Sequence, residues 1–205
     1  MFDSSDMSKR LGCGGTLISD RHIITSTRCV DWDSYPDHIL LGDTAVGVED
    51  APVMTIEVTN YILHEDRSVN IAILEMGEPV PLDKFSNIKP LCLPHKDSDF
   101  ADYEATVTGW AYNGFNGYNS WLHKNQVTIS KLGDESVIRV EPRNISSCYG
   151  DTGGPLVVSD PANNNGLTLA GVSDDNNCET FSKVSKYSEW IHSIISDSTV
   201  CQSPP

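Results

Sequence analysis

The segment Cys148-Tyr149-Gly150-Asp151-Thr152-Gly153-Gly154-Pro155 decides how this chain is interpreted. It places the hydroxyl of Thr152 between an acidic side chain and two glycines, and the apolar run that starts at Pro155 indicates a β-strand. A threonine hydroxyl acts as a nucleophile only beside an activating base. The chemistry of this loop therefore depends on which other side chains the fold brings to it.

Further blocks of the sequence accompany this loop. They are Cys13-Gly-Gly-Thr-Leu-Ile-Ser, Ile24-Thr-Ser-Thr-Arg-Cys29, Ser68-Val-Asn-Ile-Ala-Ile-Leu74, Lys89-Pro-Leu-Cys-Leu-Pro94, Thr108-Gly-Trp110 and Lys183-Val-Ser-Lys-Tyr-Ser-Glu-Trp-Ile191. In order and spacing, these blocks resemble the trypsin- and chymotrypsin-like serine proteases (peptidase S1) over nearly the whole chain. The resemblance implies that Arg28, Asn70 and Thr152 stand at the family's catalytic histidine, aspartate and serine.

All three triad positions are therefore changed. In the family's mechanism a neutral imidazole takes the proton of the nucleophile, and a carboxylate fixes the tautomer of that imidazole. Arginine stays protonated at physiological pH and has no acceptor atom, so Arg28 cannot act as a general base. We therefore predict a non-catalytic trypsin-like homologue, a pseudoprotease that acts as an extracellular binding or regulatory module.

The alternative is an active serine-type endopeptidase that uses Thr152 with an unrecognised base. Among the histidines, His64 is the least remote candidate, because it precedes Asn70 by six positions. We regard an exposed loop histidine as the better explanation of His64. We also expect Arg28 to bond to carbonyls or acids in the cleft, since a buried guanidinium without acceptors is costly.

The resemblance also implies the positions of the substrate pocket. Ser146 would stand at its floor, while one wall would contain Ser173, Asp174 and Asp175, with the two acids in place of the family's Trp-Gly pair. We therefore expect no trypsin-like pocket. The backbone amides of Gly150 and Thr152 would remain as an oxyanion hole. A sequon at Asn144 predicts a glycan at the pocket mouth.

Composition limits the classes of partner. The net charge of -15 disfavours nucleic acid and anionic membrane surfaces, and the chain has no apolar run long enough for membrane insertion. Six cysteines without a C-x-x-C pair argue against a zinc cluster, and we expect no metal and no cofactor. We expect protein partners, with active proteases or their substrates suggested by the family; the oligomeric state stays open.

The cysteines indicate disulfides and hence a secreted, extracellular protein, although the polar residues 1–10 show no signal peptide. Spacing alone leaves the pairing open. The resemblance implies that Cys13 pairs with Cys29 and Cys148 with Cys178, which leaves Cys92 for Cys201.

Short apolar runs between turn signals predict an all-β fold. One amphipathic segment, from Tyr187 to Ile195, predicts a C-terminal helix with Ser185 as its N-cap. The resemblance implies a single 1–205 domain of two six-stranded Greek-key barrels, residues 1–96 forming the first and residues 97–205 the second with the helix. The chain starts without the family's activation sequence, and truncation of the first strand would give the same start.

Overall fold

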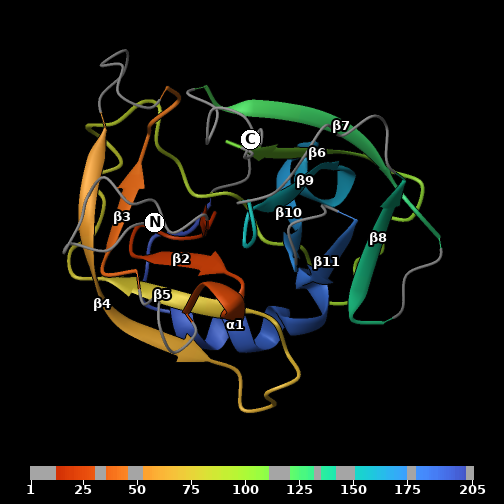
Figure 1. Ribbon diagram of the computed structural model, residues 1–205, viewed down its shortest axis with the longest axis horizontal. Coiled ribbons are helices and arrows are strands. Elements are labelled where there is room, and N and C mark those ends of the chain that lie inside the picture. Colours follow the sequence, from red (N-terminus) through yellow and green to blue (C-terminus); the bar gives the residue numbers. More distant parts are fainter. Residues whose placement is uncertain are drawn as a thin grey trace, which may run out of the picture.

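The computed structural model describes residues 13–30, 36–45, 53–110, 121–131, 135–141, 151–174 and 179–201. Within these ranges the chain forms two antiparallel sheets and one α-helix (Figure 1). The first sheet is built from strands that precede residue 77, and the second from strands that follow residue 103. This confirms the all-β architecture with a C-terminal helix.

The first sheet has five strands in the order β1-β2-β5-β4-β3. Their bounds are β1 Thr16–Leu17, β2 His22–Thr25, β3 His38–Leu41, β4 Met54–Leu63 and β5 Ala72–Met76. A cluster of buried side chains that includes Ile23, Ile56 and Leu74 packs against this sheet. The described residues of this half supply five strands where six were expected.

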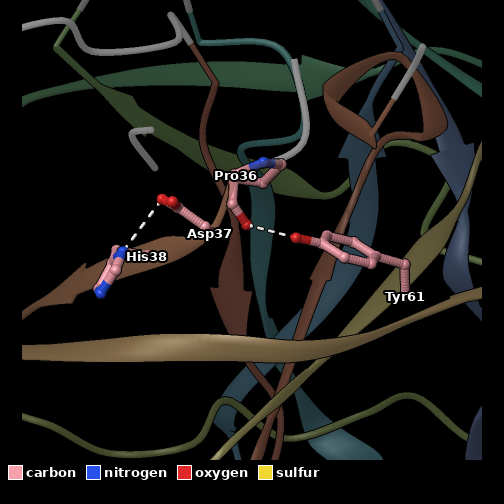
Figure 2. A network of polar contacts seen from close by, with 4 residues as sticks. All are labelled: Pro36, Asp37, His38 and Tyr61. Carbon is pink, nitrogen blue, oxygen red and sulfur yellow. Dashed lines mark hydrogen bonds and ion pairs between the residues drawn. The ribbon is translucent and has the colours of Figure 1, made fainter. Parts of the chain in front are cut away.

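Two polar contacts join the chain before β3 to β4 and to β3 itself (Figure 2). The hydroxyl of Tyr61 on β4 donates to the carbonyl of Pro36 at 2.9 Å, and Nδ1 of His38 lies 3.0 Å from a carboxylate oxygen of Asp37. The amide of Val58 also donates to the carbonyl of Asp37. These contacts fix the entry of β3 against β4.

The second sheet closes into a six-stranded barrel in the order β10-β11-β8-β7-β6-β9. Its strands are β6 Glu104–Gly109, β7 His123–Ile129, β8 Val137–Glu141, β9 Pro155–Asp160, β10 Gly166–Ser173 and β11 Thr180–Lys183. On β6, Ala105 and Val107 point inward, and on β9 Leu156 and Val158 do so. This alternation is the period of two that a half-buried strand requires.

The C-terminal helix α1, Ser188–Ile195, covers the junction of the two sheets (Figure 1). Its Ile191 and Ile195 are buried in a cluster with Ile71 of the first half and Val172 of the second. The expected cap by Ser185 is wrong, because a 3-10 turn (η4, Val184–Tyr187) precedes the helix. The hydroxyl of Ser185 donates instead to the carbonyl of Ser98.

Two disulfides fasten the described chain. They join Cys13 to Cys29, a pair that the resemblance implied, and Cys92 to Cys201, the pair that was left by elimination. Cys148 and Cys178 lie outside the described residues. The segment before Cys201 packs on the first half, because Val200 forms a bridge with Ser19 and Asp20 donates its amide to the carbonyl of Thr199.

His22 is buried beneath this C-terminal segment. Its Nδ1 lies 2.8 Å from the hydroxyl of Ser19 and 3.2 Å from that of Ser198. Burial lowers the pKa of His22, an effect that Glu75 and Asp20 oppose and Arg21 reinforces. The imidazole is therefore held in its neutral form at the junction of the chain end and the first sheet.

Replacing the buried Ile191 by alanine should lower the free energy of unfolding by about 2–5 kcal/mol, because it leaves a cavity between helix and sheets. Urea denaturation measures this. The matched control is Leu167→Ala, whose side chain is 62% exposed, with an expected change within about 0.5 kcal/mol. Equal losses for the two variants would show that the helix does not seal the junction.

His22 should make stability depend on pH. The unfolded chain binds a proton at this residue below about pH 6.5, whereas the folded chain resists it until a lower pH. Stability should thus be constant above that pH and fall as the pH drops through the window below it. His22→Asn should flatten this slope in urea titrations, while the exposed control His95→Asn should not. An unchanged slope in His22→Asn would contradict the assignment.

Candidate functional site

Thr152 lies where the two sheets meet. It is only 6% exposed, and its carbonyl accepts a hydrogen bond from the amide of Gly14 at 2.8 Å. The next residue, Gly153, has φ +82°, and a Cβ there would overlap Thr25 of β2. Its amide donates to the carbonyl of Ser173 on β10 at 2.9 Å. The loop is therefore clamped between the first and the second sheet, and only glycine fits after Thr152.

Asn70 comes two residues before β5 and forms the centre of a polar network. Its Oδ1 accepts hydrogen bonds from the hydroxyls of Ser26 (2.7 Å) and Thr27 (2.6 Å). Its Nδ2 donates to the carboxylate of Asp174 at 3.1 Å. A carboxamide can accept and donate at once, and this site uses both abilities.

Asp174 follows β10 and brings a carboxylate to this network from the second sheet. The hydroxyl of Ser182 on β11 also donates to its Oδ1. An aspartate at position 70 would set two carboxylates about 3 Å apart, a separation at which both do not stay ionised. The amide at Asn70 is therefore matched to the acid at Asp174.

Arg28 belongs to a 3-10 turn, η2 (Thr27–Val30), and its side chain is exposed. Its backbone amide donates to the hydroxyl of Ser26 at 3.2 Å. Among the described residues no acceptor for its guanidinium is found, and the expected bond to carbonyls or acids of the cleft stays a prediction. Water solvates an exposed guanidinium, so no protein acceptor is required.

The histidine rings with described contacts are engaged elsewhere. His64 packs edge-on against Tyr187 and Trp190 near helix α1, with ring centroids 5.7 and 5.1 Å away, and its Nδ1 accepts from the amide of Asp66. The candidate base thus lies against the helix end. His192 bonds to the carbonyl of Ser188 one helical turn away.

Asp151 is buried beside Thr152, and its carboxylate accepts a hydrogen bond from the backbone amide of Trp110 at 2.8 Å. The carboxylate packs directly on Gly109, where any Cβ would overlap it. In the sequence, Gly109 and Trp110 were used only as part of the family resemblance. Their contacts with the Asp151 carboxylate were not predicted. Ser26, Thr27 and Ser182 were missed as well, because no motif links them to Asn70 or Asp174.

Several predicted positions lie outside the described residues: Asn144, Ser146, Gly150 and Asp175. The oxyanion hole, the pocket floor and the glycan therefore stay predictions. Ser173 is buried, and its amide donates to the carbonyl of Gly154. Across the described ranges no three His, Cys, Asp or Glu side chains are grouped to hold a metal ion, and no helix there is long and apolar enough to cross a membrane.

Comparison with known proteins finds similar sequences over nearly the whole chain. A family model described as Trypsin matches residues 3–191. Glucanase inhibitor protein 3 of Phytophthora infestans is 30% identical over 89% of this chain and 77% of its own length. Chymotrypsin-C of Rattus norvegicus is 28% identical over 93% of this chain and 80% of its own.

Two further relatives are longer than this chain. Phenoloxidase-activating factor 1 of Holotrichia diomphalia is 26% identical over 95% of the chain, which spans only 64% of that relative. The chain also matches vitamin K-dependent protein C of Rattus norvegicus, but it spans only 50% of the length of that protein. The likeness to these two proteins therefore concerns one part of each.

Asn70→Asp should destabilise the protein by about 1–3 kcal/mol at neutral pH, because it removes a donor to Asp174 and adds a like charge beside it. The loss should shrink on acidification, when one carboxyl of the pair takes a proton. The exchanged double variant Asn70→Asp/Asp174→Asn should recover most of the loss, since it restores one amide and one acid. Denaturation across pH measures all three proteins, and a fully stable Asn70→Asp variant would contradict the network.

Proposed function

Because the chain belongs to the trypsin family, we propose that it is a non-catalytic member that acts as an extracellular binding or regulatory module. The observation that carries this proposal is the hydrogen bond from Asn70 to Asp174. It occupies the place where the family resemblance expects the triad carboxylate, and an aspartate would meet like charge there. The network is thus built for an amide.

Among the described residues, neither Arg28 nor His64 is placed to act as a proton relay for Thr152. A hydroxyl nucleophile needs a group that titrates near neutral pH within hydrogen-bond reach. Arg28 is a permanent cation on an exposed turn. His64, the histidine nearest to Asn70 in the sequence, packs against aromatic rings at the start of the terminal helix. Thr152 keeps a hydroxyl, but a hydroxyl alone does not hydrolyse peptides.

The names of the relatives support a role in binding. One is called a glucanase inhibitor protein and another a phenoloxidase-activating factor, while a third is a chymotrypsin. The family fold thus occurs under names that denote inhibition and activation as well as digestion. For this chain we propose protein partners, among them active proteases or their substrates.

An extracellular location follows from the same proposal. Disulfides persist in oxidising compartments, and the described residues contain two, between Cys13 and Cys29 and between Cys92 and Cys201. A glycan at the Asn144 sequon would fit that location. The disulfides also keep the fold intact when the residues of the site change.

A fluorophosphonate probe tests the proposal, because it labels an activated hydroxyl nucleophile covalently. The folded, disulfide-intact protein should remain unlabelled and should give the same signal as Thr152→Ala, while an active chymotrypsin in the same assay labels fully. Labelling of the wild type that disappears in Thr152→Ala would establish the alternative, an active endopeptidase with a threonine nucleophile. Cleavage of a peptide substrate that depends on Thr152 would do the same.

A further inference from the structure

The chain end packs on the turn between β1 and β2 as a strap, residues 196–200. The strap begins where helix α1 ends, at Ile195, and it leads to Cys201, which is disulfide-bonded to Cys92. Four of its five residues are exposed, and Ser198 is half-buried. The two ends of the strap are therefore fixed, while its middle lies at the surface.

Backbone contacts hold the strap against this turn. The amide of Asp20 donates to the carbonyl of Thr199 at 2.8 Å, and the amide of Thr199 donates to Oδ1 of Asp20 at 3.1 Å. Val200 forms an antiparallel bridge with Ser19. Thr199 and Val200 are exposed, so these contacts lie next to water. Segments held by exposed hydrogen bonds open locally while the rest of the protein stays folded.

The ring of His22 lies beneath the strap and is only 5% exposed. Its Nδ1 is within hydrogen-bond distance of two hydroxyls, that of Ser198 on the strap and that of the fully buried Ser19. Oγ of Ser19 accepts a hydrogen bond from the amide of Arg21 at 3.1 Å, which leaves its own proton for Nδ1. Nδ1 is therefore an acceptor while the strap is closed. A proton on Nδ1 would make it a donor, and both hydroxyls would have to turn.

The sheet side of His22 is rigid. Strand β2 is paired on both edges, with β1 and with β5, and His22 stands opposite Glu75 of β5. An imidazolium that is shut away from water costs free energy unless water or an acceptor reaches its N–H groups. The strap, whose residues are mostly exposed, is the side that can move to let water reach the ring.

Charged groups around the ring set the pH range of this movement. They lie on each neighbouring element: Asp20 and Arg21 in the turn, Glu75 and the exposed Glu78 on and after β5, and the exposed Asp197 on the strap. Burial has the largest effect and lowers the pKa of His22, while Glu75 and Asp20 oppose burial and Arg21 reinforces it. The ring is therefore neutral at physiological pH and takes a proton only in acid.

We propose that the strap is released in acid: it covers the neutral ring of His22, and it lifts from the turn between β1 and β2 when the ring takes a proton. The hydrogen bonds between Asp20 and Thr199 then break, and water reaches the ring. Helix α1 and the disulfide at Cys201 keep both ends attached, so the movement is a local opening. This device is independent of Thr152 and of the proposed function.

Hydrogen exchange across pH tests the release in the disulfide-intact protein. After correction for the intrinsic pH dependence of exchange, protection of the Asp20 and Thr199 amides should fall about tenfold per pH unit below about pH 6.5, because each opening takes up one proton. Low urea should not accelerate this exchange, because a local opening exposes little surface. The buried barrel amide of Leu169 should stay more strongly protected, and urea should accelerate its exchange.

Two pairs of variants assign the effect. His22→Asn removes the titrating group and should make the protection of the strap independent of pH, whereas the exposed control His95→Asn should keep the wild-type slope. Ser198→Ala removes the strap's hydroxyl from the ring and should lower protection at neutral pH roughly threefold or more. Its matched control is Ser196→Ala, an exposed serine of the same strap, which should behave like the wild type.

Four results would overturn the proposal. The first is constant protection of the strap amides between about pH 7.5 and 5.5, across the ordinary pKa of histidine. The second is a pH slope that persists in His22→Asn. The third is exchange of the strap amides with the same protection and urea dependence as Leu169, because the strap would then open only when the whole protein unfolds. The last is equal protection in Ser198→Ala and Ser196→Ala, which tests the contact even where His22→Asn does not fold.

Discussion

The hydrogen bond from the amide of Asn70 to the carboxylate of Asp174 constrains the whole site. It joins residues 104 positions apart, one before β5 and the other after β10, and so it bridges the two sheets. Because Oδ1 of Asp174 accepts this hydrogen bond, the facing side chain has to donate one, and a carboxylate cannot do so. Positions 70 and 174 are thus chemically coupled, and a carboxylate at position 70 would conflict with the one at Asp174.

The fold does not depend on that chemistry. Ile71, Val172 and Ile191 come from the two sheets and the terminal helix, and all are buried in one cluster at the junction. Burial of such side chains, together with two disulfides, supplies stability that an exposed Arg28 neither adds to nor removes. The body of the fold therefore does not depend on which side chain stands at position 28, while Gly153 stays fixed by the close approach of Thr25.

The sequence predicted those features that arise from local periodicity. The alternating Leu156 and Val158 lie in strand β9. The apolar stripe through Ile191 and Ile195 lies on helix α1. The sequence did not predict the partner of Asn70, because Asp174 and Ser182 come from other strands and no motif joins them. The position of Ser185 before an apolar stripe favoured a cap, but a 3-10 turn displaced the helix start. Burial of Arg28 was assumed from the family's cleft, and the turn at Thr27–Val30 exposes it instead.

Catalysis and recognition place different demands on this fold. Hydrolysis needs a proton acceptor at one point, held to within fractions of an ångström, and a single cation at that point abolishes it. Binding of a protein partner needs no proton acceptor, because it relies on shape and on hydrogen bonds spread over a surface. The proposed role as a binding module therefore does not depend on the chemistry of the triad positions.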